Sequence, residues 1–298
     1  MTLPNSTEPA TGSSRSPLRD YWILIRPRII GLVLFTMIVA ALVAGEPPGA
    51  LELLHALVGS ALVIAGAIAL NQRIERRTDA LMRRTFRRPL PSGRLTPRRV
   101  TWFGALTSGA GLGYLALTAS PTVLALTAAS WVVYVWIYTP IKALSAWQTP
   151  LGALAGAMPV LMGAAVADAP WSLVALVLFG IDYLWQFPHA MAIAWIYRDD
   201  FAAAQLQVAT VVDPSGRSAG VISLVGAVLL LPVSLAPWYD LSRSPWLAVP
   251  VVLLGLWYLA ASIAFYRAPD DRTARTLLRV SLAYLPLVFG VLWMGARS

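Results

Sequence analysis

The chain consists of long apolar runs separated by short polar segments. A helix that spans a membrane needs about 20 mostly apolar residues, and nine runs are candidates. Their ranges are 21–44, 51–70, 100–117, 123–138, 148–167, 171–195, 219–236, 246–266 and 276–294. The pattern predicts an all-α integral membrane protein with nine transmembrane helices in one bundle.

Composition supports this prediction. Hydrophobic residues make up 58% of the chain and charged residues only 12%, which is too apolar for a soluble protein of this size. The net charge of +9 comes from basic residues at membrane-edge loops rather than along one soluble face, so we expect no nucleic-acid partner. The lack of cysteine excludes thiol catalysis, disulfides and a thiolate metal site.

Basic residues lie in alternate loops, which orients the helices. Lys and Arg in short loops prefer the cytoplasmic side of a membrane. They precede the first span, fill the loop after the second, and follow the fourth, sixth and eighth, whereas the opposite loops carry few charges. This distribution predicts a cytoplasmic N-terminus, an outside C-terminus and a multi-pass protein of the bacterial plasma (inner) membrane.

The segments outside the spans are too short for a soluble domain. Residues 1–16 are polar and turn-rich, and they lack the apolar core of a signal peptide. We therefore expect a disordered cytoplasmic tail at 1–19 and a single transmembrane domain at 20–298.

The densest charge cluster, residues 71–93 (NQRIERRTDALMRRTFRRPLPSG), directly follows the second apolar run. Asn71, Glu75 and Asp79 are spaced i, i+4, i+8, so their oxygens point the same way if the helix continues past the membrane edge. Mg²⁺ prefers hard oxygen ligands and usually binds one or two carboxylates together with phosphate oxygens. The spacing predicts a metal-diphosphate platform; the alternative is a solvated helix end whose acids pair with neighbouring arginines.

Four arginines, Arg83, Arg84, Arg87 and Arg88, follow the acidic row within one or two turns. The arginine fork binds phosphate through two hydrogen bonds. Carboxylates alone would repel a diphosphate, but carboxylates that hold Mg²⁺ beside arginines accept one. The two kinds of charge therefore indicate one anion-binding site at the cytoplasmic edge.

This motif resembles that of the UbiA-type intramembrane prenyltransferases. Their second helix typically ends in N-x-x-x-D-x-x-x-D, followed in several members by R-T-x-x-R-P and a turn with glycine. The matching positions here are Asn71, Glu75, Asp79, Arg84, Thr85, Arg88, Pro89 and Gly93. Glu75 departs from the usual aspartate; it keeps the charge and adds one methylene, so we expect metal binding with a shifted geometry.

A second motif, residues 182–200 (DYLWQFPHAMAIAWIYRDD), ends the sixth apolar run on the same predicted side. It is similar to the W-Q-x-P-H signature of the heme o synthase group within this family, through Trp185, Gln186, Pro188 and His189. The Y-T-P-x-K, K-P-R and D-Y patterns of that group have counterparts in Tyr138, Thr139, Pro140 and Lys142, in Arg26, Pro27 and Arg28, and in Asp200 and Phe201. The resemblance covers residues 22–294.

His189 is a candidate functional residue even without this resemblance. It follows a proline inside a span, and an ionisable side chain at membrane depth is by default a functional candidate. A neutral histidine there can ligate heme iron, move a proton or hydrogen-bond a carbonyl that the proline frees. The sequence leaves these three roles open.

The resemblance implies a prenyltransferase that moves a farnesyl group from farnesyl diphosphate to a vinyl of heme b, with hydration, giving heme o and diphosphate. It implies Mg²⁺ as the cofactor and the bilayer as the surroundings, with a downstream heme a synthase as a partner. The rival interpretations are a UbiA-type enzyme for a quinone precursor or chlorin, and a transporter. Nearly all charge lies on one predicted side, which disfavours transport.

The resemblance also implies roles for single residues. The catalytic set is Asn71, Glu75, Asp79, His189 and Asp200. The metal ligands are Asn71, Glu75, Asp79, Asp199 and Asp200. The diphosphate ligands are Arg84, Arg88, Lys142 and Arg198. The residues facing the heme or prenyl group are Tyr138, Trp185, Gln186 and His189.

Overall fold

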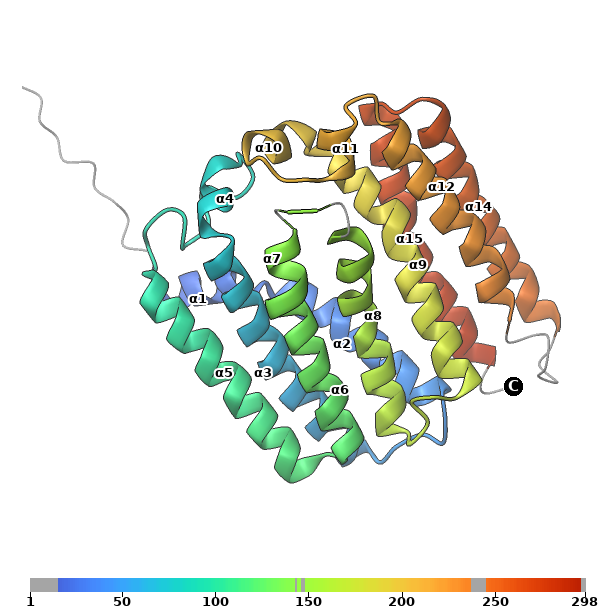
Figure 1. Cartoon of the computed structure of the whole chain (residues 1–298). Helices are drawn as coiled ribbons and strands as arrows, with labels where there is room; N and C mark the ends of the chain where they lie inside the picture. The colour runs from blue at the N-terminus through green and yellow to red at the C-terminus, as the bar shows by residue number, and fades with distance from the viewer. Residues whose placement is uncertain (1–15, 143, 146–147, 237–244, 296–298) are drawn as a thin grey trace, which may run out of the picture.

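The computed structural model of the protein describes residues 16–142, 144–145, 148–236 and 245–295, and all regular structure within these residues is helical (Figure 1). The predicted tail at 1–19 lies mostly outside the described residues, whose first helix begins at Pro17. The predicted all-α class is confirmed.

Eight segments are long and apolar enough to cross a membrane. They are α3 (Ala50–Ile74), α5 (Pro97–Thr118), the segment Pro121–Ile141, α8 (Gln148–Val166), α9 (Leu173–Ile196), α12 (Arg217–Leu235), α14 (Ala248–Arg267) and α15 (Asp271–Gly295). The segment Pro121–Ile141 consists of α6 (Pro121–Val132), the π-helix η1 (Val133–Tyr138) and α7 (Thr139–Ile141). The short 3₁₀-helix η2 (Pro245–Leu247) precedes α14.

A ninth span is formed by two helices that meet at an angle. α1 (Pro17–Ile25) and α2 (Pro27–Val43) are bent by 41° with respect to each other and count as one span when taken together. Arg26 between them has a left-handed backbone with φ of 54°, and a residue that precedes proline is disfavoured in a right-handed helix. The described residues therefore hold eight candidate spans, and the expected nine when this pair, broken at Arg26, is counted as one.

Small residues bring α3 and α5 close together, and the two helices run side by side in Figure 1. A Cβ added at Gly66 would collide with Ser108 Oγ and lie 2.6 Å from the carbonyl oxygen of Gly104. A Cβ at Gly111 would lie 2.7 Å from the carbonyl oxygen of Gly59. Helices in lipid associate through such close contacts, because lipid tails are as apolar as the side chains themselves.

Three short helices lie together at one end of the bundle: α4 (Arg76–Leu81), α10 (Arg198–Ala203) and α11 (Ala209–Val212) (Figure 1). Met82, just after α4, packs in one buried apolar cluster with Phe201 and Leu206. This contact joins the segment that follows α3 to the segment that follows α9. The two charged motifs of the sequence therefore meet in one cap.

Candidate active site

A cavity of about 390 Å³ lies between the helices and reaches the cap. Its charged and polar lining comes from Glu75, Asp79, Arg84, Arg88 and Lys142, near the cap. Its deeper walls are mostly apolar and come from α2, α3, α6, α8 and α9, with Val33, Val63, Ile64, Ala67, Trp131, Pro159 and Met162 among the lining residues. The space therefore suits a molecule with an anionic head and an apolar body.

The acidic row lies along one wall of this cavity, as its spacing predicts. α3 ends at Ile74 and α4 begins at Arg76, and Glu75 between them bonds to each helix. The backbone N–H of Glu75 donates to the Asn71 carbonyl at 2.9 Å, and that of Asp79 donates to the Glu75 carbonyl at 2.8 Å. The helix is interrupted at Glu75, but these two bonds keep the i, i+4, i+8 order, and Asn71, Glu75 and Asp79 all line the cavity.

The amide of Asn71 has a defined orientation. Its Nδ2 donates to Thr139 Oγ1 at 3.0 Å, and the Thr139 hydroxyl itself donates to the Tyr134 carbonyl at 2.7 Å. The hydroxyl proton is thus already used, so Thr139 must accept from Asn71. Asn71 Oδ1 is left as the atom that can act as an oxygen ligand.

Each carboxylate of the row has a cationic partner from a different segment. Arg88 Nη1 lies 2.7 Å from Asp79 Oδ2, and Lys142 Nζ lies 3.0 Å from Glu75 Oε1. Burial raises the pKa of Asp79 above its usual range, opposed by the nearby Arg88 charge. Burial also disfavours charge on Lys142, but Tyr138 and Glu75 together raise its pKa. The alternative was a solvated helix end whose acids pair with Arg73, Arg76 and Arg83; in the described residues Asp79 is instead buried against Arg88, and Glu75 pairs with Lys142.

Arg84 also faces the cavity and is held between two aromatic rings. Its guanidinium carbon lies 4.8 Å from the Tyr197 ring centroid and 4.9 Å from that of Phe201. Burial, with repulsion from Arg88, lowers the pKa of Arg84. A guanidinium stacked on rings is oriented without a carboxylate partner among the described residues, so its hydrogen-bond donors remain available for an anion.

Asp200 ties the two motifs together. Its carboxylate accepts from the backbone N–H groups of Arg83 and Arg84, at 3.2 and 3.1 Å. The Asp200 side chain thus orients the loop that carries Arg84. Neither Asp200 nor Asp199 is among the residues that line the cavity.

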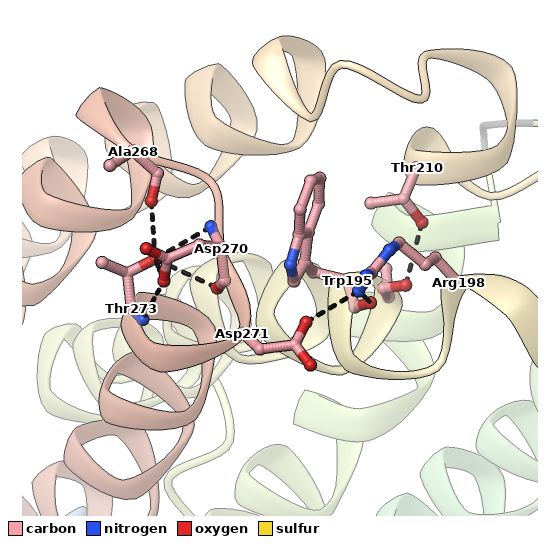
Figure 2. A network of polar contacts seen from close by, with 8 residues as sticks. Trp195, Arg198, Thr210, Ala268, Asp270, Asp271 and Thr273 are labelled. Carbon is pink, nitrogen blue, oxygen red and sulfur yellow. Dashed lines mark hydrogen bonds and ion pairs between the residues drawn. The ribbon is translucent and has the colours of Figure 1, made fainter.

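Arg198 lies apart from the cavity lining. Figure 2 shows its guanidinium directed toward the Trp195 carbonyl and Asp271. Nη1 of Arg198 donates to both, at 2.9 Å and 2.8 Å respectively. Arg198 therefore links the end of α9 to the first turn of α15.

The W-Q-x-P-H residues divide between two faces of α9. Gln186 lines the cavity, as does Tyr138 of η1, but Trp185 and His189 do not. Trp185 Nε1 donates to the Ser281 carbonyl at 2.7 Å, and the Trp185 and His189 rings stack with centroids 4.7 Å apart. This pair therefore faces α15.

The hydrogen bonds of Ser281 define the tautomer of His189. Ser281 Oγ donates to the Leu278 carbonyl at 2.7 Å and lies 2.8 Å from His189 Nδ1. Since the single hydroxyl proton is used on Leu278, His189 Nδ1 must donate to Ser281. In the neutral ring Nε2 is then the atom with a free lone pair, which is the form that ligates a metal or accepts a proton.

Several lining residues were not predicted from the sequence, among them Arg26, Tyr134 and Gln148. Tyr134 belongs to the π-helix, a rare element that frequently marks functional sites. Arg26 belongs to the R-P-R segment that the resemblance had singled out only as a pattern. Gln148 carries no sequence signal beyond its place at the start of an apolar run.

The donors present suit Mg²⁺ that is shared with a diphosphate. Glu75, Asp79 and Asn71 Oδ1 present hard oxygens toward one cavity, and Mg²⁺ usually takes one or two carboxylates together with phosphate oxygens and water. In the described part of the chain, no group of three or more His, Cys, Asp or Glu could hold a metal by itself. The fit is to a metal-diphosphate complex rather than to a metal cage.

The sequence and the helical fold are similar to those of known proteins. The UbiA prenyltransferase family matches residues 32–287, and the chain belongs to this family. Among its relatives, the protoheme IX farnesyltransferase of Solibacter usitatus (strain Ellin6076) is 38% identical over 92% of this chain and 98% of its own. The protoheme IX farnesyltransferase of Opitutus terrae (strain DSM 11246 / JCM 15787 / PB90-1) is 36% identical over 96% and 97%.

Solved structures have the same fold at low sequence identity. A digeranylgeranylglyceryl phosphate synthase matches with a TM-score of 0.78 and 15% identity, over 94% of this chain and 98% of its own. A UbiA homologue from Archaeoglobus fulgidus bound to DMAPP and Mg²⁺ matches with a TM-score of 0.67 and 11% identity, over 92% and 99%. The predicted UbiA-type bundle is confirmed.

Proposed function

We propose that this protein transfers the farnesyl group of farnesyl diphosphate to a vinyl group of heme b and that water adds in the same reaction, giving heme o and diphosphate. The observation that carries the proposal is the single cavity that joins Glu75, Asp79, Arg84, Arg88 and Lys142 to a long apolar interior. Two relatives at 38% and 36% identity that are named protoheme IX farnesyltransferase support the choice of substrates.

The charged end of the cavity receives the diphosphate. Arg84 is oriented by Tyr197 and Phe201 and offers free donors, while Arg88 and Lys142 lie at the acidic row. On binding, we expect Arg88 and Lys142 to turn part of their hydrogen bonds from Asp79 and Glu75 to phosphate oxygens. These groups stabilise the negative charge that develops on the leaving diphosphate.

Asn71, Glu75 and Asp79 would hold Mg²⁺ together with the diphosphate. The metal supplies Lewis-acid stabilisation of the leaving group. Asp200 acts on this end through the backbone of Arg83 and Arg84, so we assign it a positioning role. Asp199 and Arg198 are not among the residues that line the cavity. Their roles as a metal ligand and a diphosphate ligand remain predictions.

The apolar walls surround the farnesyl chain and align its first carbon with the acceptor. Loss of diphosphate leaves an allylic cation, the heme vinyl attacks it, and water quenches the resulting cation beside the pyrrole. His189, with Nε2 free and Trp185 stacked on it, is our candidate for orienting heme from the α15 side.

The decisive experiment is expression in a host that supplies heme and farnesyl diphosphate, followed by mass analysis of the extracted hemes. We expect a new heme that is heavier by one farnesyl group and one water. Prenylated quinone precursor or chlorin without this heme would overturn the proposal in favour of the rival substrate class.

We further propose that the charged end faces the cytoplasm of a bacterial plasma membrane and that the product passes to a heme a synthase. The loop between α4 and α5 carries the largest share of basic residues, and such loops prefer the cytoplasmic side. Cysteine labelling from each side of inverted vesicles tests the orientation: Ser92→Cys should react only from the cytoplasmic face.

A further inference from the structure

We propose that Gln186 is the residue that positions the water for the hydration step; this assignment rests on the proposed function. Gln186 lines the cavity from α9 and faces α8. Nothing in the mechanism above uses it.

The orientation of the Gln186 amide is unambiguous. Its Nε2 donates to the Ala153 carbonyl at 3.1 Å and to the Asp182 carbonyl at 3.0 Å. Both partners are acceptors only, so the amide cannot be flipped, and both N–H protons are used. The remaining polar atom, Oε1, has no hydrogen-bond partner among the described residues.

Gly156 makes room for this oxygen. A Cβ added at Gly156 would collide with Gln186 Oε1, and Gly156 itself lines the cavity. Oε1 is therefore a rigid acceptor at the cavity wall. It can receive a hydrogen bond from a donor inside the cavity and cannot give one.

Oε1 lies deeper in the cavity than the cap end of α8. Gln148, at the cap end of α8, bonds to the Gln207 carbonyl. Gly156 is eight residues further along α8, which is about 12 Å at 1.5 Å per residue. The donor at this depth is a neutral molecule, because a phosphate oxygen would be repelled by an amide oxygen.

Water is the donor that the reaction requires there. The cation that follows carbon–carbon bond formation has two fates: a water lone pair forms the new C–O bond, or a neighbouring carbon loses a proton and an alkene forms. In the first case one water proton is released, and the diphosphate left in the cavity accepts it. A water held by Gln186 Oε1 favours the first outcome.

The test is the product ratio of Gln186→Met, which keeps the length of the side chain and removes its donors and acceptor. Extracted hemes are separated by mass into the hydrated adduct and the adduct lighter by one water. We expect the lighter fraction to rise at least tenfold over the wild type, with the apparent KM for farnesyl diphosphate unchanged. Labelled water should leave its oxygen in the hydrated product.

Two further variants keep the test decisive. Gly156→Ala pushes on Oε1 without changing Gln186 and should shift the ratio in the same direction, even if Gln186→Met does not fold. Gln207→Met, at an exposed glutamine that does not line the cavity, should leave the ratio as in the wild type.

Failure of the proposed function and failure of the Gln186 assignment give different results. If the wild type makes no farnesylated heme, the proposed function fails. If the wild type makes the hydrated adduct and both Gln186→Met and Gly156→Ala keep its ratio, the role of Gln186 fails alone. A folded Gln186→Met that binds farnesyl diphosphate but makes neither adduct also overturns it, since bond formation should not need Gln186.

Discussion

Asp79 and Arg88 lie nine residues apart and close a tight loop through a 2.7 Å ion pair, in which the Asp79 side chain is only 1% exposed. Thr85 Oγ1 donates to the Asp79 carbonyl at 2.7 Å within the same loop. The pair therefore both shapes the segment after α4 and places a cation beside a candidate metal ligand. Changing either residue should therefore affect both the stability of this segment and the binding of diphosphate. The two effects can be measured separately.

We predict that Arg88→Ala raises the apparent KM for farnesyl diphosphate by roughly 10- to 100-fold, because a charge-assisted phosphate contact contributes about 1.5 to 3 kcal/mol. It should also lower the melting temperature, since breaking a buried pair costs about 3 to 5 kcal/mol. Arg88→Lys keeps the charge and should lose less stability. Steady-state kinetics and thermal unfolding check both effects, and an unchanged KM would remove Arg88 from the diphosphate site.

Asp79→Ala should nearly abolish Mg²⁺-dependent turnover. The carboxylate is expected to hold the metal-diphosphate complex, and Glu75 and Asn71 alone supply too few charges. Glu75→Asp should be milder, because the charge is kept although the reach to Lys142 is shorter. Near-wild-type turnover of Asp79→Ala in the presence of a chelator would show that the metal platform is wrongly placed.

Lys142→Met should uncouple metal and diphosphate binding. Without the ammonium group 3.0 Å from Glu75, the acidic row keeps its full negative charge, so Mg²⁺ alone should bind more tightly. The diphosphate should bind more weakly in the same variant. Calorimetric titration with Mg²⁺ and with inorganic diphosphate measures each, and the exposed Arg275→Met is the matched control.

Gly66→Ala should destabilise the bundle by about 1 to 3 kcal/mol, the usual cost of overpacking. The new methyl would meet Ser108, whose Oγ accepts from Trp131 Nε1 at 3.0 Å and so links α5 to α6. Gly109→Ala is the control, because a Cβ there meets nothing within 4 Å. Denaturation in detergent should separate the two; equal stabilities would contradict the close α3–α5 contact.

Ser281→Ala tests the assigned tautomer of His189. Removing the acceptor should cost about 1 kcal/mol of stability and should alter the heme absorption spectrum if Nε2 contacts heme. Ser262→Ala, at a buried serine of α14 whose Oγ has no partner in the described chain, controls for cavity effects.

His189→Ala should lose heme binding and keep Mg²⁺-dependent binding of farnesyl diphosphate. Loss of both substrates together in His189→Ala would mean a purely structural role.

The apolar runs by themselves determined the helical membrane class and the positions of the spans. A helix needs about 20 apolar residues to cross the bilayer. A chain with so many such runs and so few charged residues fits a helical membrane bundle better than other folds. The i, i+4, i+8 spacing also determined that Asn71, Glu75 and Asp79 share one wall, because residues at that spacing lie on one helix face. Pro27 was a local indication of the helix break at Arg26. The apolar run 21–44 continues through this position and therefore predicted one unbroken helix.

Only the tertiary structure decided which side chains meet across helices. It paired Glu75 with Lys142, placed Asp200 on the backbone of Arg83 and Arg84, and turned His189 toward Ser281 while its neighbour Gln186 faces the cavity. A span that is apolar on all sides carries no stripe to indicate its rotation. Rotation and depth are set by packing against neighbouring helices, through contacts between residues far apart in the chain.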